Sequence, residues 1–247
     1  GTSAGLPVTT GIPAMNYFLS DDIAEPHDAE RHYSERLLRA ASPLSCQRRM
    51  TLPPNRKTRA DFGFSSDDHL YVCAQKIEKF HPDFDALLGE ILRRDERGRI
   101  VIPRDKGGYR ARKLQRRLAT TIEDVVERIV FVPRLDVGDY LSLLDASDVI
   151  LDPLHYGGGL TAYDAFSLNK PVVTLPTGFV RGRYVHGFYR RMGICHCTAT
   201  PPDEYVSIAV TLGTDAERRR QVSEQIAESS SALFDSGSSV RDYEAIF

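Results

Sequence analysis

The sequence has little of what marks secreted, membrane-spanning or nucleic-acid-binding proteins. Its 247 residues include only four cysteines, Cys46, Cys73, Cys195 and Cys197, whose spacing makes no disulfide framework. The 32 basic and 34 acidic residues nearly cancel, so no overall field favours nucleic acid or an anionic membrane. No apolar run approaches the roughly 20 residues that span a bilayer, and the N-terminus lacks the basic-then-apolar order of a signal peptide. We therefore expect a cytoplasmic globular protein with reduced thiols and with neither a nucleic-acid nor a membrane partner.

Metal-binding patterns are equally scarce. The triplet Cys195-His196-Cys197 offers three ligand types, but neighbouring side chains on a strand point to opposite faces and no second ligand pair follows at zinc-like spacing. We expect no metal site. The isolated His81 and His155 are candidate site residues by position alone, since a single histidine more often makes a structural hydrogen bond.

Beyond residue 60, short apolar strands alternate with amphipathic helices. Strands are expected at 70–74, 99–102, 129–132, 149–151 and 172–175. Helices are expected at 83–94, 109–120, 137–144 and 161–168, with two or three more from residue 183 onward. This alternation predicts an α/β fold, a Rossmann-like parallel sheet covered by helices. In such sheets ligands bind beyond the carboxyl ends of the strands, which points to the loops after Cys73, Val132, Leu151 and Leu175.

The first 60 residues have a different pattern. A short buried strand is expected at 16–20, and a helix at 28–39 with Tyr33, Leu37 and Leu38 on one face. The proline-bearing stretch 42–66 suits a linker. The glycine- and threonine-rich start, with no strand or cap before it, suggests a piece of something longer. We expect residues 1–60 to end another lobe and to form a linker, and residues 61–247 to form the Rossmann-like domain.

A dense basic stretch lies between residues 104 and 117, on an expected amphipathic helix. It is conceivable as a nucleic-acid surface. Acidic residues Glu123, Asp124 and Glu127 follow directly, so a solvated helix face with internal ion pairs is the preferred interpretation.

The most informative motif is the run from His155 to Asp164, which contains three glycines and lies between a buried strand and a helix. Gly157, Gly158 and Gly159 let the backbone approach a ligand, and Thr161 supplies a hydroxyl and an N-cap at a helix end that favours phosphate. The spacing is neither Walker A nor the Gly-x-Gly-x-x-Gly fingerprint, which argues against ATP hydrolysis and NAD. A glycine run by itself is also a common flexible turn.

Several ordered motifs occur together: residues 71–85, 150–153, the glycine run, 171–176, 181–183, 204–215 and 233–235, with shorter stretches at 16–20 and 33–37. Together they resemble the catalytic region of the O-GlcNAc transferase and SPINDLY family of GT-B glycosyltransferases. The resemblance covers almost the whole chain. It implies the C-terminal half of a GT-B fold, with a remnant of the N-terminal lobe.

The resemblance also implies roles near the donor phosphates. Gln75 and Lys79 match the loop that meets the diphosphate, and Lys79 is the catalytic cation, because a fixed ammonium offsets the charge that develops on the leaving nucleotide. Without the flanking motif, Lys79 would be interpreted as an exposed lysine at a helix start. Thr161 and the backbone amides of the glycine run would hold phosphate.

Other roles concern the nucleoside. Asp164 would bind the ribose, although a carboxylate in the first turn of a helix is also favourable by itself. Leu135 and Tyr140 would lie near the nucleobase. Arg183 would hold either the donor or its own loop, and surface pairing is an equal alternative. His155 is retained as a weak candidate.

The implied activity is inverting transfer of a sugar, in the first place GlcNAc from UDP-GlcNAc, to protein Ser or Thr hydroxyls without a metal. Family relatives also use UDP-glucose or GDP-fucose, so the sugar and base stay open. Leu160 departs from the asparagine or histidine-threonine pair common in the glycine run. The catalytic-lobe histidines and tetratricopeptide repeats of relatives do not precede Gly1, so half of the active site is expected here. Two alternatives remain: a degenerate non-catalytic relative, and a Rossmann-like module for another nucleotide.

Overall fold

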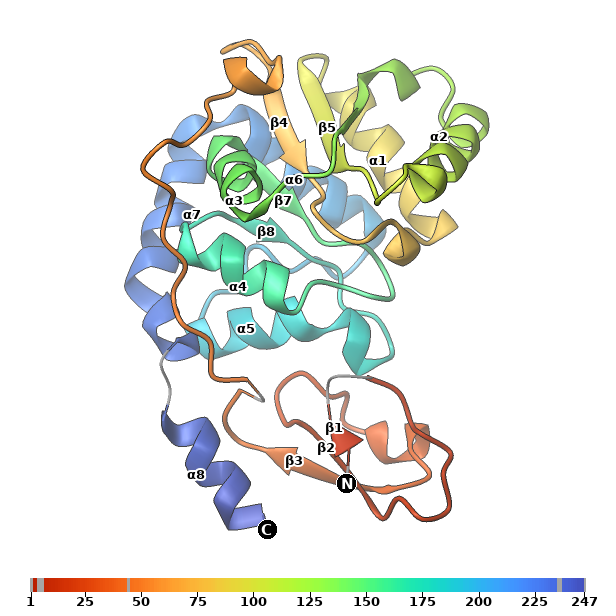
Figure 1. Cartoon of the computed structure of the whole chain (residues 1–247), viewed down its shortest axis with the longest axis vertical. Coiled ribbons are helices and arrows are strands. Elements are labelled where there is room, and N and C mark those ends of the chain that lie inside the picture. Colours follow the sequence, from red (N-terminus) through yellow and green to blue (C-terminus); the bar gives the residue numbers. More distant parts are fainter. Residues whose placement is uncertain (1, 4–6, 44, 235–236, 247) are drawn as a thin grey trace.

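Two parallel sheets organise the chain in the computed structural model, which describes residues 2–3, 7–43, 45–234 and 237–246 (Figure 1). The larger sheet has the order β6-β5-β4-β7-β8. Its strands are β4 (His69–Val72), β5 (Gly98–Pro103), β6 (Ile129–Val132), β7 (Val149–Leu151) and β8 (Val172–Val173), and each neighbouring pair is parallel. The expected α/β fold with a parallel sheet is therefore confirmed.

Helices separate the strands of this sheet, as the alternating pattern predicts. They are α1 (Pro82–Arg94), α2 (Tyr109–Thr121), α3 (Val137–Ala146), α4 (Leu160–Ser167), α5 (Tyr184–Met192), α6 (Pro202–Thr214), α7 (Ala216–Ser229) and α8 (Gly237–Ile246). Helices α1 and α6 pack against each other and against the strands, while α3 lies in front of the sheet in Figure 1. Among the described residues, no helix is long and apolar enough to cross a bilayer.

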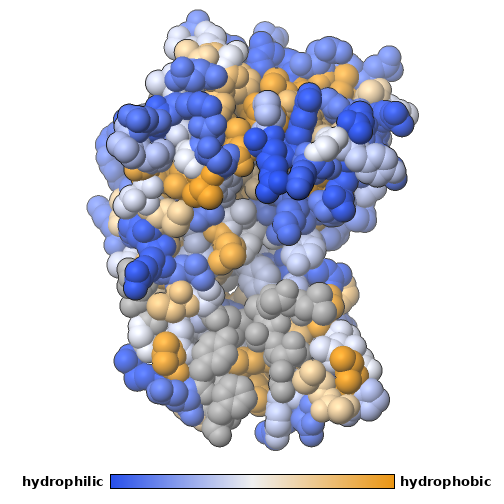
Figure 2. Space-filling view, viewed as in Figure 1, coloured by the Kyte–Doolittle hydropathy of each residue, from blue (hydrophilic) through white to orange (hydrophobic). Residues whose placement is uncertain are grey.

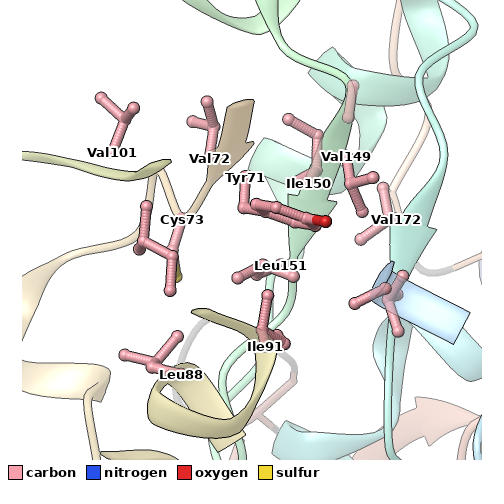
Figure 3. Packing of buried hydrophobic residues seen from close by; sticks show 14 of the residues in the cluster. Tyr71, Val72, Cys73, Leu88, Ile91, Val101, Val149, Ile150, Leu151 and Val172 are labelled. Carbon is pink, nitrogen blue, oxygen red and sulfur yellow. The ribbon is translucent and has the colours of Figure 1, made fainter. Parts of the chain in front are cut away.

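Helix α1 shows why these segments form helices. Pro82 occupies the first helical position, the His81 side chain accepts a hydrogen bond from the backbone N–H of Asp83, and Arg93 and Arg94 lie in the last turn. Each of these suits the end of the helix where it occurs. The buried face carries Leu88 and Ile91, which lie beside Tyr71 and Leu151 of the sheet in Figure 3.

The core of the large sheet is apolar on both faces. All three residues of β7 are buried, as are Leu70, Tyr71 and Val72 of β4, which is expected for parallel strands covered by helices on both sides. The one hydroxyl at this point, on Tyr71, donates to Asp95 Oδ2 at 2.7 Å. A buried tyrosine therefore keeps its polar partner.

The smaller sheet contains β1 (Thr2–Ser3), β2 (Tyr17–Asp21) and β3 (Arg36–Ala40), all parallel. The helix expected at 28–39 is wrong: a 3₁₀ turn, η1 (Ala29–His32), is followed by β3. Leu37 and Leu38 pair in register with Phe18 and Leu19. Pairing with a neighbouring strand outweighs a helical spacing of only a few apolar residues.

The expected linker lies along the larger part of the molecule (Figure 1). The backbone N–H groups of Met50 and Lys57 donate to the hydroxyls of Ser167 and Ser142, at 3.0 and 3.2 Å. Further on, Arg59 pairs with the buried carboxylate of Asp148 at 2.7 Å. This stretch is therefore held by specific contacts along its length.

In the described part of the C-terminal region there are four α-helices, α5 to α8, where two or three were expected. The sequence between residues 202 and 229 divides at Asp215, whose side chain caps α7 by accepting from the N–H of Arg218 at 2.9 Å. The last helix, α8, lies beside β3 of the smaller sheet (Figure 1), and Asp242 in it accepts from the backbone N–H of Ser42. The C-terminal end therefore returns to the N-terminal part.

The basic stretch lies largely on α2, and Figure 2 shows hydrophilic side chains over that end of the molecule. Arg110 pairs with Glu78 at 3.0 Å and Arg117 with the buried Asp85 at 2.8 Å. The expected ion pairs exist, but their acidic partners precede α2 in the sequence. The acidic Asp124 that follows α2 pairs with Arg93 instead.

Candidate functional site

The order of strands creates a crevice at one place in the large sheet. From β4 the chain moves to β5 and β6 on one side, then crosses to β7 and β8 on the other. Between β4 and β7 the direction reverses, and ligands of open α/β sheets bind outside the carboxyl ends of the strands at such a point. The loop after β4 carries Gln75 and Lys79, and the loop after β7 carries Gly157 to Gly159. Topology therefore brings together residues about 80 positions apart.

A cavity of about 720 Å³ opens at this crevice, a volume in the range of small-molecule sites. Five predicted site residues line it: Gln75, Lys79, Gly157, Gly159 and Thr161. Its remaining walls include the aromatic side chains of Tyr156, Tyr163, Tyr184 and Phe188, and Pro7, Asp21 and Ser45 of the N-terminal part. The cavity thus lies between the large sheet and the N-terminal part.

Lys79 ends the short 3₁₀ turn η3 (Ile77–Lys79) on the cavity wall. Its Nζ donates to the carbonyl of Gly157 at 2.8 Å and to Gln75 Oε1 at 3.0 Å, and lies 4.5 Å from the ring centroid of Tyr156. Burial lowers the pKa of Lys79, and the nearby negative charge of Asp152 opposes that shift. An ammonium has three N–H donors, and among the described residues only these two groups accept from it, so one N–H is left for a ligand.

Gln75 connects Lys79 to the helix after the glycine run. Its Oε1 accepts from Lys79 while its Nε2 donates to Thr161 Oγ1, and the side chain is buried. Thr161 is the second residue of α4, and Gly159 occupies the N-cap position without a side-chain cap. The expected N-cap role of Thr161 is therefore wrong, because its hydroxyl interacts across the crevice with Gln75.

Two of the three glycines are required by close contacts. A Cβ on Gly157 would approach the Asp152 carboxylate to 2.7–2.8 Å, and one on Gly158 would approach Gln75 Nε2 and Thr161 Oγ1 to 2.6 and 2.7 Å. These distances are shorter than any van der Waals contact. A Cβ on Gly159 would meet nothing within 4 Å. The run is thus a tightly packed loop at two positions and open at the third.

Asp152 anchors this loop and was missed by the sequence analysis. It lies directly after β7, is buried, and accepts from the N–H of Gly158 at 2.6 Å and from Thr174 Oγ1 at 2.8 Å. Burial raises the pKa of Asp152 to about 6, although both hydrogen bonds and the charge of Lys79 act in the opposite direction. Its sequence signal is an acidic residue at the carboxyl end of a fully apolar strand.

The residues expected at the nucleoside form a separate group. Tyr140 of α3 donates from its hydroxyl to Asp164 Oδ2 of α4 at 3.1 Å, and burial raises the pKa of Asp164. Leu135, in the loop after β6, packs partly buried against the core, as does Tyr140. None of these three lines the cavity described above. A hydrogen bond therefore links Asp164 to Tyr140, and both residues lie outside the cavity lining.

Arg183 contacts two loops. Its Nε donates to the carbonyl of Ala24 at 2.7 Å, and its Nη1 to the carbonyl of Thr177 at 3.2 Å. It does not line the cavity. These contacts hold the N-terminal part against the loop after β8, so Arg183 contacts its own loop through backbone carbonyls.

His155 precedes the glycine run and turns to the rim of the site. Its Nε2 lies 2.8 Å from Asp83 Oδ2, and its ring meets that of His81 edge-on with centroids 4.6 Å apart. His155 has a φ of 67°, in the left-handed region. The sequence did not indicate this grouping, because Asp83 and His155 lie 72 positions apart.

Comparison with known proteins assigns the chain to a family. A SPINDLY protein of Arabidopsis thaliana, named as a probable UDP-N-acetylglucosamine–peptide N-acetylglucosaminyltransferase, is 25% identical over 87% of this chain and 23% of its own length. The SEC protein of the same plant, with the same descriptive name, is 23% identical over 97% of this chain and 25% of its own length. The chain thus spans about a quarter of these relatives.

A solved structure agrees in fold. The O-GlcNAc transferase of Thermobaculum terrenum, as a lysine-to-methionine mutant, superposes with a TM-score of 0.77 at 24% identity, over 97% of this chain and 45% of that one. The family model described as glycosyl transferase family 41 matches residues 39–243. That match includes the crevice, the glycine run and the closing helices, and the chain belongs to glycosyl transferase family 41.

Proposed function

We propose that this chain supplies the nucleotide-sugar donor site of a glycosyltransferase that moves GlcNAc from UDP-GlcNAc to Ser or Thr hydroxyls of proteins. One observation carries the proposal. Among the described residues, the Lys79 ammonium donates only to Gln75 and Gly157, which leaves one N–H for a ligand beside the closely packed Gly157 and Gly158. The names of the plant relatives support the donor and the peptide acceptor.

The proposed reaction is a direct displacement. The acceptor hydroxyl oxygen forms a bond to the anomeric carbon while the bond from that carbon to the diphosphate oxygen breaks, so the configuration inverts. The hydroxyl proton passes to a base, and no residue of this chain is proposed for that role. Negative charge grows on the departing diphosphate, and Lys79 with the amides at the start of α4 offsets it. No metal takes part in this scheme.

The fold holds the groups that stabilise the leaving diphosphate in place before the reaction begins. Gln75 orients both Lys79 and Thr161, and Asp152 fixes the amide of Gly158. Groups already held in place need no rearrangement when charge develops, which is the main source of electrostatic catalysis. The site is therefore better suited to stabilising a leaving group than to redox or hydrolytic chemistry.

Calorimetric titration of the purified chain with UDP, GDP and NAD, without added metal, tests the proposal. Micromolar binding of UDP, weakened roughly 30-fold in Asp164→Ala and kept in the exposed control Asp67→Ala, is the expected result. Binding of GDP in its place would retain the transferase but change the donor. NAD binding alone would favour a dinucleotide module, and silence from all three nucleotides would favour the degenerate relative.

The protein acceptor, the contribution of an upstream catalytic lobe and the cytoplasmic location belong to the same proposal. They concern the whole enzyme, of which this chain corresponds to about a quarter by comparison with the plant relatives. A peptide-glycosylation assay on the complete protein is the measurement that addresses them.

A further inference from the structure

Three side chains with metal-ligand chemistry meet at the rim of the crevice. They are His81 and Asp83, at the start of α1, and His155, just before the glycine run. One ligand atom from each lies within 4.8 Å of the other two. Asp83 Oδ2 is 3.3 Å from His81 Nδ1 and 2.8 Å from His155 Nε2. All three remain at least partly exposed, so an ion can reach them from solvent.

These separations suit a first-row divalent metal. Zinc binds imidazole nitrogen and carboxylate oxygen at about 2.0–2.2 Å, and in a tetrahedral site neighbouring ligand atoms are then roughly 3.4 Å apart. Asp83 Oδ2 lies 3.3 and 2.8 Å from the two imidazole nitrogens, close to that value. Two imidazoles and one carboxylate are a borderline ligand set that suits zinc over magnesium or calcium. A fourth position stays open to water.

The backbone of His155 is set in an uncommon conformation at this point. Only His155 and Asn169 have positive φ among the non-glycine residues that the structure describes, and such conformations concentrate at functional sites. Gly182 packs directly against it, since a Cβ there would lie 3.3 Å from the His155 Cα and carbonyl carbon. The ligand side chain is thus presented by a backbone that has little freedom.

Charge at the site depends on Asp83. A helix N-terminus disfavours a cation, so a neutral His pair at the start of α1 would be a poor site alone. An aspartate carboxylate is ionised near pH 7, so Asp83 supplies the negative charge that the cation needs. To bind a metal through Nε2, His155 carries its proton on Nδ1 and gives up its hydrogen bond with Asp83. His81 likewise gives up the hydrogen bond that its Nδ1 accepts from the backbone N–H of Asp83.

We propose that His81, Asp83 and His155 form a binding site for a zinc ion, separate from the chemistry of transfer. His81 is two residues after Lys79, and His155 is two residues before Gly157. A bound ion therefore clips the Lys79 segment to the glycine run. The link between these two segments matters only if the proposed donor site exists, whereas zinc binding itself does not depend on that proposal.

Zinc titration of the metal-free chain, followed by calorimetry, tests the site. One zinc ion per chain is expected. Asp83→Asn and His155→Asn each remove a ligand, and Asn tolerates the left-handed backbone at position 155, so folding is preserved. Loss of a direct ligand should weaken binding by at least the roughly 10- to 100-fold typical of outer-shell changes. The exposed His27→Ala is the matched control and should bind as the wild type does.

Cobalt substitution distinguishes this site from the exposed thiols Cys46 and Cys195. A tetrahedral cobalt complex with imidazole and carboxylate ligands absorbs in the visible without a thiolate charge-transfer band. Unchanged zinc affinity in His155→Asn, or a thiolate band in the cobalt complex, would overturn the proposal.

The proposed link between the Lys79 segment and the glycine run, here the clip, is tested by the effect of zinc on UDP affinity. Zinc should raise the UDP affinity of the wild type by about five-fold or more, the lower end of usual coupling between sites, and should leave His155→Asn unaffected. Zinc binding without any change in UDP affinity would overturn the clip alone. Failure of UDP to bind under any condition would contradict the proposed function and leave the zinc titration to decide the metal site.

Discussion

The two ends of the candidate site differ in how firmly their residues are fixed. At the end proposed to bind the donor phosphates, here the phosphate end, Gln75 interacts with both Lys79 and Thr161, and Asp152 holds the Gly158 amide, so each group restrains the next. At the end proposed to bind the nucleoside, here the nucleoside end, a hydrogen bond runs from Tyr140 to Asp164, and neither residue lines the cavity. Several linked hydrogen bonds therefore hold the groups of the first region in place, whereas, among the residues that the structure describes, one hydrogen bond links those of the second.

The largest expected effect is at Lys79, measured in the complete enzyme. Lys79→Met should lower turnover by about 10²–10³-fold, the usual result of removing one group that stabilises transition-state charge. UDP affinity should fall much less, since the interaction strengthens as the bond breaks. Steady-state and single-turnover kinetics check this, with the exposed Lys113→Met as control. Normal turnover in Lys79→Met would remove the assigned role.

Next comes the packing of the glycine run. Gly158→Ala forces its Cβ against Gln75 Nε2 and Thr161 Oγ1, and overpacking typically costs about 1–3 kcal/mol, or roughly 5- to 150-fold in UDP affinity. Gly159→Ala meets no atom and should bind UDP nearly as the wild type does. Calorimetry on both variants measures the difference. Equal affinities would show that the phosphate end is looser than its contacts indicate.

Substitutions at the nucleoside end should lower the UDP affinity less than those at the phosphate end, by amounts that differ between residues. Asp164→Ala removes a proposed hydrogen bond from a charged group and should weaken UDP binding by about 2 kcal/mol, while Tyr140→Phe removes only the group that orients Asp164 and should cost about 1 kcal/mol or less. Calorimetry on the two variants and on their double mutant gives the coupling between them. If Tyr140→Phe matched Asp164→Ala, the tyrosine would itself contact the nucleotide.

The last effect concerns the dependence of stability on pH. Because the folded protein raises the pKa of Asp152 to about 6, the native state holds this proton more tightly than the unfolded chain does. That contribution is fully present below about pH 4, near the unfolded pKa, and is lost as pH rises through about 6.

Asp152→Asn has no such proton and keeps one acceptor for the Gly158 amide. The wild type should therefore lose stability relative to the variant by at most about 1.4 kcal/mol per pH unit between about pH 4 and 6. Urea unfolding of both proteins at several pH values measures this, and other titrating groups cancel in the difference. A flat difference would show that Asp152 is not perturbed in the native state.

Features set by the local sequence pattern were predictable, whereas features set by contacts between distant residues were not. The large sheet was predictable because apolar strands alternating with amphipathic helices leave few topologies. The glycine run was visible in the sequence as a loop without side chains, but its contacts with Asp152, Gln75 and Thr161 were not. The strand at Arg36–Ala40 was not, since its partner and not its own spacing decides its conformation. Asp152 and the His81, Asp83 and His155 group depend on neighbours that only folding supplies.

The route of the polypeptide between the two sheets limits how the protein can be shortened. Cutting the chain at residue 60, where the composition changes, would remove Pro7, Asp21 and Ser45 from the cavity wall. The cut would take away Arg59, one of the two arginines that pair with the buried Asp148, and leave Arg219. It would also strip α8 of the strand it lies beside. A minimal donor-binding fragment therefore has to keep its N-terminal sheet.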